Sequence, residues 1–205
     1  MSIRFALLSL LSGREMTGYE VSQQFGRSVA HVWHAPDSQI YPELRRLADE
    51  GLLDVEEVDD GARAAKKRYR VTDAGLSALR DWLAEPTPGR RQRDPAYLKA
   101  AYFEWTTTAT ARERLQEHLD FHAEQQRMLE EARATLLDRS HPTLRRRLER
   151  YPASEHERIV AWKVFAYDGL VDAAAREVAW ARRGLELADR LGDGLGDGPA
   201  AGRQA

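Results

Sequence analysis

The segment DSQIYPELRRLADEGLL, residues 37–53, decides how the rest of this sequence is interpreted. Its apolar residues recur at spacings of four and three, the pattern of a helix with one buried face: Ile40, Leu44 and Leu47. Asp37 or Ser38 is expected to cap this helix, and Gly51 follows its end. The opposite face then carries one proline and five hydrogen-bonding side chains: Gln39, Tyr41, Pro42, Arg45, Arg46 and Asp49.

The proline on this short helix needs an explanation, because proline removes a backbone donor. Pro42 is expected so near the helix start that it loses only the bond to the Ser38 carbonyl, which a first turn tolerates. Tyr41 has an alternative place in the core, since it directly follows Ile40. The outward side chains near the N-terminal end can bond phosphates and base edges: Ser38, Gln39, Tyr41 and Arg45.

Two further helices are predicted before this one. The apolar stretch from Phe5 to Leu11 predicts a core helix. Thr17, with Glu20 three residues later, has the spacing of a capping box, and this box opens a second helix that Gly26 ends. The candidate buried residues of the second helix are Tyr19, Val21 and Phe25.

A β-hairpin is predicted after Gly51. Residues 52–58, LLDVEEV, and residues 66–72, KKRYRVT, alternate between apolar and polar side chains. An Asp-Asp-Gly turn at 59–61 separates them. The apolar positions around which the two strands alternate are Val55, Tyr69 and Val71.

The charge of this hairpin is lopsided. Residues 49–60 contain seven acids and no base, whereas residues 63–70 contain five bases and no acid. The basic strand is either a solvated face or a phosphate contact, and its position behind a DNA-reading helix favours the contact. A fourth helix is expected to begin at Thr72 and to run through Trp82.

Three helices, a two-stranded β wing and a fourth helix form the order of a winged helix-turn-helix, whose third helix enters the major groove. The sequence resembles the PadR family of transcriptional regulators, closely over residues 5–84 and more weakly in RDPAYLKAAYF at 93–103. The weaker part resembles the larger subgroup of that family, which has a helical C-terminal dimerisation domain. The closely matching segments are LLSLLSGREMTGYEV (7–21), IYPELRRLADEGLL (40–53) and KKRYRVTDAGLSALRDWL (66–83).

The resemblance implies a homodimeric repressor that binds a palindromic double-stranded DNA operator and that a small-molecule effector releases. The family often has a small residue and a threonine before the tyrosine, whereas this chain has Gln39 and Ile40, so no base preference carries over. By motif position, and with the neighbouring basic residues added, the candidate DNA-binding residues are Tyr19, Ser38, Gln39, Tyr41, Pro42, Arg45, Arg46, Arg63, Lys66, Lys67 and Arg68.

The C-terminal part is predicted to contain two long helices. Thr110 with Glu113, and Ser154 with Glu157, have capping-box spacing, and the helices are expected to end near Asp138 and Leu191. The second helix is apolar on several sides, which requires neighbours beyond one helical hairpin, and a partner chain is the natural source. Its candidate packing stripe is Ile159, Trp162, Ala166, Gly169, Ala173, Trp180, Gly184, Leu187 and Leu191.

The expected fold is therefore mainly α: an N-terminal winged helix-turn-helix followed by a long-helix dimerisation domain. The three prolines of residues 85–95 indicate a linker. The expected boundaries are 1–85 for the DNA-binding domain, 86–95 for the linker, 96–191 for the helical dimerisation and possible effector domain, and 192–205 for a disordered tail.

Composition excludes several classes of function. A net charge of −2 over 205 residues gives no overall attraction to polyanions, and the absence of cysteine removes thiol chemistry. The sequence contains no phosphate-binding loop, nucleophile elbow or zinc-protease motif, so we expect no enzyme, no catalytic residue and no cofactor. No apolar run reaches the roughly 20 residues of a membrane span, and we expect a cytoplasmic protein.

Other candidate sites have simpler readings. His118 and His122 have the i, i+4 spacing of a zinc site, which would need Asp120 or Glu124 on the same face. Asp120 points elsewhere on a helix, so no metal site is expected. The tryptophans at 105, 162 and 180 are read as core residues, and Arg145 to Arg147 as a solvated turn. Trp162 and Phe165, with Trp33, form an alternative flat site for an aromatic or lipophilic effector. The alternative function is a winged-helix protein-interaction module without specific DNA binding.

Overall fold

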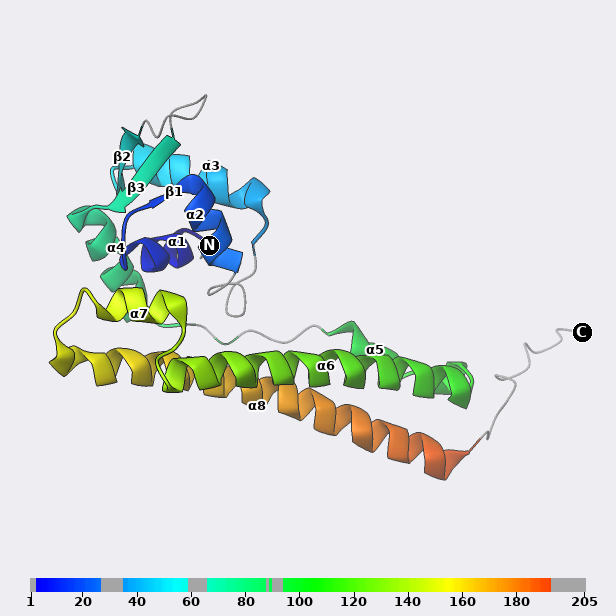
Figure 1. The fold of residues 1–205 in the computed structure, drawn as a ribbon. Coiled ribbons are helices and arrows are strands. Elements are labelled where there is room, and N and C mark those ends of the chain that lie inside the picture. The colour runs from blue at the N-terminus through cyan, green and yellow to red at the C-terminus, as the bar shows by residue number, and fades with distance from the viewer. Residues whose placement is uncertain (1–2, 27–34, 59–65, 88, 90–93, 193–205) are drawn as a thin grey trace, which may run out of the picture. The chain divides into compact units, whose positions relative to one another are not determined.

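The computed structural model describes residues 3–26, 35–58, 66–87, 89 and 94–192 (Figure 1). Contacts between Cα atoms divide the chain into two units, Met1–Pro88 with Asp138–Val160, and Gly89–Leu137 with Ala161–Ala205. The predicted mainly α fold, with an N-terminal winged helix and long C-terminal helices, is confirmed. Features of the sequence analysis that lie outside the described residues are Trp33, the turn at 59–61, Arg63 and the tail after Gly192.

The first unit contains the helices α1 (Ile3–Leu11), α2 (Gly18–Gln24), α3 (Asp37–Asp49), α4 (Asp73–Ala84) and α7 (Pro142–Leu148). Its core is formed where α1, α2 and α3 turn their apolar faces toward one another. At the edge of that core, Phe5 and Trp82 stack face to face, with ring centroids 4.6 Å apart. The side chains that are almost completely buried are Leu7, Leu8, Leu11, Val21, Phe25, Ile40, Leu44, Leu47 and, on α7, Leu144.

The capping box of α2 is present as predicted. The Thr17 hydroxyl accepts a hydrogen bond from the Glu20 backbone amide, and the Glu20 carboxylate accepts one from the Thr17 amide. Val21 and Phe25 are buried, as expected. The expectation for Tyr19 was wrong, because this side chain is 63% exposed.

The sheet has one strand more than predicted. The hairpin strands β2 (Leu53–Val58) and β3 (Lys66–Val71) pair antiparallel, as expected. A two-residue strand, β1 (Met16–Thr17), pairs with the other edge of β3, so the order is β1-β3-β2. Two residues are too short to show an alternation of apolar and polar side chains, which is why no pattern predicted β1.

The start of α3 differs from the prediction. The residue before the helix is Pro36, and no side chain caps the helix, so neither Asp37 nor Ser38 is the cap. Asp37 instead accepts a hydrogen bond from the Ser22 hydroxyl of α2, at 2.6 Å. Pro42 consequently lies in the second turn, where it still removes only the bond to the Ser38 carbonyl, on the exposed side of the helix.

Gly75 allows the first turn of α4 to pack against the β2–β3 hairpin. The Gly75 amide donates to the Thr72 hydroxyl, which caps α4 at the predicted residue. A Cβ atom at Gly75 would lie 2.3 Å from the Leu52 carbonyl oxygen and 2.9 Å from a Val71 methyl. Only glycine therefore allows the first turn of α4 to pack this closely against the entry and exit of the hairpin.

Helix α7 belongs to the first unit. Arg147 and Arg150 donate hydrogen bonds to the carbonyls of Ser9 and Gly13, at 3.3 and 2.8 Å. Arg145 and Arg146 are exposed. The arginine run therefore lies on a helix rather than on a turn, and part of it holds α7 to the end of α1.

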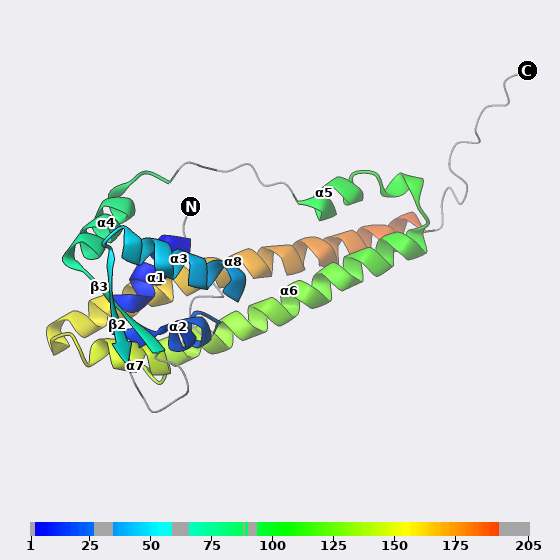
Figure 2. The same cartoon turned by 90° about the horizontal axis from the view of Figure 1, so that it is seen from above.

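The second unit contains α5 (Pro95–Ala100), the short helix η2 (Phe103–Trp105), α6 (Thr108–Leu137) and most of α8 (Ala153–Leu191). Helices α6 and α8 run antiparallel along each other, as Figures 1 and 2 both show. Arg112 pairs with Asp189 and Arg133 with Asp168, so the two ion pairs fix the register near opposite ends of the contact.

The predicted caps of both long helices were wrong, although their ends were right within one residue. Helix α6 begins at Thr108, where the Thr107 hydroxyl accepts from the Thr110 amide. Helix α8 begins at Ala153, directly after Pro152. Thr110 and Ser154 therefore lie inside the first turns.

The predicted packing stripe of α8 was also wrong in part. The residues buried within the chain lie one or two positions away from the predicted stripe, at Val160, Val164, Tyr167, Ala174, Val178, Ala181 and Ala188. Of the predicted stripe, Gly184 does pack closely, since a Cβ there would lie 2.9 Å from Leu115. Trp105 and Trp162 are 69% and 66% exposed, so they are not core residues.

No helix in the described part of the chain is long and apolar enough to cross a membrane.

Candidate nucleic-acid interface

Helix α3 presents its polar face outward, as predicted. Ile40, Leu44 and Leu47 are at most 1% exposed and hold the helix against the core. On the other side, the residues that the structure leaves exposed are Ser38, Gln39, Tyr41, Pro42, Arg45 and Arg46. Helix α3 is therefore packed against the core on one side and exposes hydrogen-bonding side chains on the other.

Tyr41 lies between the core and solvent. Its side chain is 36% exposed, and a Cβ atom on Gly18 would approach its ring to 2.9 Å. Gly18, the first residue of α2, therefore lets the ring lie directly on the backbone of that helix. The core alternative for Tyr41 is correct for one side of the ring only, and the remainder of the side chain faces outward.

Arg45 and Arg46 have different surroundings. Arg46 donates to Glu50 at 3.0 Å and lies 4.0 Å from Glu43, and Glu50 also pairs with Arg4. These bonds, with Arg4 first, lower the pKa of Glu50. Within the described residues, no carboxylate pairs with Arg45.

Arg45 lies near Tyr69 on the neighbouring strand. Burial raises the pKa of the Tyr69 hydroxyl, and the positive charge of Arg45 acts in the opposite direction. The Arg45 guanidinium therefore lies near a neutral phenol and has no carboxylate partner in the described chain. This makes Arg45 a better candidate than Arg46 for a base or phosphate contact.

Acidic side chains of β2 lie opposite basic side chains of β3 in the hairpin. The register places Glu56 opposite Arg68 and Glu57 opposite Lys67, while Asp54 pairs with Arg70 at 2.8 Å. Opposite charges at such cross-strand positions stabilise a hairpin. The acidic and basic blocks of the sequence therefore form two paired strands of one sheet. The acids of β2 offset most of the positive charge of β3.

The basic residues of β3 differ in whether a carboxylate already pairs with them. Arg68 lies 3.6 Å from Glu15, so a carboxylate already engages it. Lys67 is exposed and has no ion-pair partner among the residues that the structure describes. Lys66 is also exposed. Arg63, the remaining candidate, lies outside the described residues.

Tyr19 extends from α2 into solvent. Its hydroxyl accepts a hydrogen bond of 2.7 Å from the Gln23 amide on the next turn. This bond holds an exposed ring in one orientation, in the same unit as the exposed face of α3. The apolar pattern had predicted a buried Tyr19. The resemblance to the family implied a DNA contact for Tyr19, which requires an exposed side chain.

The candidate effector residues occupy the surface of α8. Trp162 and Phe165 lie edge to face, with centroids 5.9 Å apart, and both are about two-thirds exposed. Neither lines the cavity beside Arg14 and Arg150 or the cavity beside His118 and Trp180, and their third expected partner, Trp33, lies outside the described residues. Together they form an apolar surface rather than a pocket.

Comparison with known proteins agrees with this geometry. The model of the transcriptional regulator PadR-like family matches residues 7–81. The chain is 36% identical over 101 residues to the negative transcriptional regulator PadR of Bacillus subtilis (strain 168). That alignment covers 49% of this chain and 56% of the relative, so the chain matches little more than half of the relative's length.

Solved structures resemble the chain over nearly its whole length. Bacillus subtilis PadR in complex with operator DNA gives a TM-score of 0.72 at 25% identity, covering 92% of this chain and 100% of that one. The same protein in complex with p-coumaric acid gives a TM-score of 0.67 at 23% identity, covering 91% and 95%.

Proposed function

We propose that this chain, which belongs to the transcriptional regulator PadR-like family, represses transcription by binding a palindromic DNA operator as a homodimer. The family consists of DNA-binding regulators, and the chain is not an enzyme. The repressor role is supported by the similar regulator of Bacillus subtilis, whose name describes it as negative.

The observation that carries the proposal is the free polar face of α3. A major groove about 12 Å wide admits one helix, and the N-terminal half of α3 would enter it with Gln39, Tyr41 and Arg45 leading. An arginine without a carboxylate partner is the residue best suited to bidentate contact with guanine. In this assignment Arg45 contributes to base choice, because it is exposed and lacks a carboxylate partner in the described chain.

The wing and α2 would hold the duplex backbone. Lys67 extends from β3 without an ion-pair partner in the described chain, and Tyr19 is exposed on α2. Contacts of this kind bind phosphates irrespective of sequence and fix the position of the reading helix. Arg46 and Arg68 would add less, because carboxylates already engage both of them.

The homodimer would form through the exposed side of α8. Monomeric proteins seldom expose two large aromatic side chains together, and Trp162 and Phe165 are followed by exposed Ala166 and Gly169. No atom lies within 4 Å of a Cβ at Gly169, so a second helix can approach closely there. A twofold axis would then present two copies of α3 to successive grooves of a palindrome.

A small aromatic or lipophilic effector would release the operator. Bacillus subtilis PadR has been solved with p-coumaric acid, which supports this class of ligand. A ligand bound beside Trp162 and Phe165, at the proposed dimer surface, would change the spacing of the two reading helices. By linkage, such a ligand would bind more weakly to the protein when operator DNA is present.

Fluorescence anisotropy with two duplexes tests the proposal. One duplex comes from the DNA upstream of the chain's own coding sequence, and the other has the same composition in random order. The chain is expected to prefer the first, with affinity that falls steeply as salt rises. Replacing Lys67 with alanine should weaken binding to both duplexes alike and reduce the salt slope by about one.

The outcome also separates the alternative function. Absence of binding to either duplex at low salt, together with specific recovery of a protein partner, would favour a winged-helix interaction module that uses the acidic strand β2. Equal affinity for both duplexes in the native chain would contradict sequence-specific regulation.

A further inference from the structure

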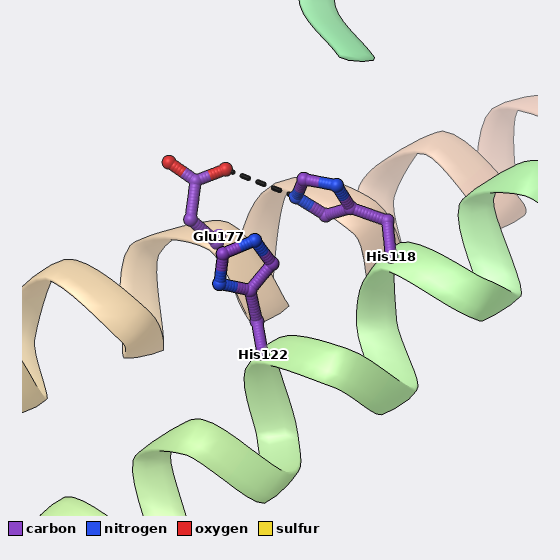
Figure 3. Close-up of side chains that lie close together, drawn as sticks. All are labelled: His118, His122 and Glu177. Carbon is purple, nitrogen blue, oxygen red and sulfur yellow. Dashed lines mark hydrogen bonds and ion pairs between the residues drawn. The ribbon is translucent and has the colours of Figure 1, made fainter. Parts of the chain in front are cut away.

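A cluster of two histidines and a glutamate lies between α6 and α8, far along the chain from α3 (Figure 3). His118 and His122 occupy successive turns of α6, with ring centroids 4.3 Å apart. Glu177 reaches them from α8, and its carboxylate lies 3.1 Å from Nε2 of His118. One donor atom from each residue lies within 4.8 Å of those of the other two.

The cluster is shielded and already supported by neighbouring side chains. The side chains of His118 and Glu177 are only 13% and 15% exposed. The Tyr97 hydroxyl of α5 donates to both oxygens of Glu177, at 2.7 and 2.9 Å, and this bond raises the pKa of Tyr97 to about 12. Trp180 packs edge-on against His118 at 5.0 Å. Support of this kind is what metal ligands require to keep their orientation.

His122 is available as a ligand. Within the described residues no hydrogen bond engages its ring nitrogens, although the side chain is partly buried. An imidazole whose nitrogens have no hydrogen-bond partner in the described chain, close to the Glu177 carboxylate, suits a metal ligand.

We propose that His118, His122 and Glu177 bind one divalent transition-metal ion of the zinc class. Two imidazole nitrogens and one carboxylate oxygen are a donor set typical of zinc, with bond lengths of roughly 2.0–2.2 Å. Tetrahedral ligands at such lengths lie roughly 3.3–3.5 Å apart. The His118 to Glu177 separation, 3.1 Å, is already close to that value, and all three donor atoms lie within 4.8 Å of one another, so a bound ion would draw His122 closer to the other two.

A cavity of about 300 Å³ adjoins the cluster, and its lining includes His118, Phe121, Trp180 and Phe103. Because His118 lines this cavity, water in it could supply the fourth ligand of a bound ion. The bound ion would join α6 directly to α8, and through Tyr97 and Glu177 it would also hold α5 in place.

The sequence alone did not indicate this site. On the sequence, the candidate third ligands are Asp120 and Glu124, and Asp120 does not share the helix face of the two histidines. The third ligand instead comes from 55 residues further along the chain, a distance that only the antiparallel pairing of α6 with α8 closes.

Calorimetric titration of the full-length, chelator-treated chain with Zn²⁺ tests the proposal. One ion should bind per chain, and Co²⁺ should give the visible absorption of a tetrahedral site and quench the fluorescence of Trp180. His118→Gln, His122→Gln and Glu177→Gln should each weaken Zn²⁺ binding at least tenfold. Tyr97→Phe, which removes support without removing a ligand, should weaken it by roughly tenfold.

The controls separate this site from the other histidines. His156→Ala and the double change His31→Ala with His34→Ala should leave Zn²⁺ affinity and the Co²⁺ spectrum unchanged. Thermal melts in chelator identify any variant that fails to fold, in which case Tyr97→Phe and the Co²⁺ quenching of Trp180 decide. No binding by the native chain at 1 mM Zn²⁺, or loss of binding in the control variants instead, would overturn the proposal.

Discussion

The two units of this chain differ in how completely they bury their apolar side chains. In the first unit, the core side chains of α1, α2 and α3 are almost inaccessible, and the exposed aromatic rings of α2 and α3 belong to the face proposed to bind DNA. In the second, Trp105, Phe121, Trp162 and Phe165 are at least 60% exposed. The first unit therefore buries its apolar faces and leaves a polar face exposed, whereas the second leaves large aromatic side chains exposed on its helices.

The cause of the difference is the periodicity of α8. One stripe, with Val160, Val164 and Tyr167, is buried within the chain, and a second apolar group at Trp162 and Phe165 remains outside. A helix that is apolar on two sides cannot satisfy both with one partner. We therefore assign dimerisation to the exposed side of α8 and DNA reading to α3, and each assignment can be tested separately.

The largest effect is expected when the exposed side of α8 is made charged. Changing Trp162 and Phe165 to glutamate should weaken self-association by about 4 kcal/mol, roughly a thousandfold, because two aromatic anchors are lost from the centre of the interface. Sedimentation velocity across protein concentrations measures the change. Trp105→Glu, a tryptophan equally exposed on η2, is the matched control and should leave association unchanged.

The next effect concerns the closed core of the first unit. Gly75→Ala should destabilise the fold by about 3 kcal/mol, since its methyl group would meet the rigid Leu52 carbonyl. Urea denaturation measures this loss. Gly26→Ala, which meets nothing within 4 Å, should cost far less, and equal losses for the two variants would show that the packing of α4 is looser than described.

A smaller effect separates the two arginines of α3. Arg45→Ala should reduce operator affinity by about 2 kcal/mol, roughly thirtyfold, and should relax the preference for operator over random DNA. Arg46→Ala should change affinity less, because Glu43 and Glu50 already engage that side chain. Anisotropy titrations on both duplexes measure the pair, and a larger loss for Arg46 would reverse the assignment.

The smallest effect is expected at Gly18. Alanine there would displace the ring of Tyr41, which can move, so stability should change little. Operator affinity should nevertheless fall by about 1 kcal/mol, roughly fivefold, because the displaced ring no longer lies where it faces the groove. Thermal melts and anisotropy on the same sample distinguish this result from a general loss of structure.

The sequence predicted the winged helix more accurately than the helix pair for a physical reason. Helix α3 has one apolar face, so Ile40, Leu44 and Leu47 left only one way to orient it. On α8 two apolar stripes have the same spacing, and only contact with α6 determines which is buried. Gly184 fitted the expectation because Leu115 packs on it, whereas Gly169 faces outward.

Helix starts show the same dependence on context. Thr17 caps α2 because it is held in the extended strand β1, which prevents the helix from starting earlier. Thr110 and Ser154 have equally good spacing, but Thr107 and Pro152 before them begin the helices sooner. The exposed residues of α3 could be predicted because they follow from the periodicity of one helix. The position of Glu177 could not be predicted, because it depends on how the distant helices α6 and α8 pair.

The mass of the complex between the native chain and its own upstream duplex, measured by sedimentation equilibrium, tests the central claim most directly. We predict two chains on each palindromic duplex, with Arg45→Ala reducing the amount of complex while leaving the free dimer intact. A single chain per duplex, or a chain that is monomeric both free and bound, would contradict the account.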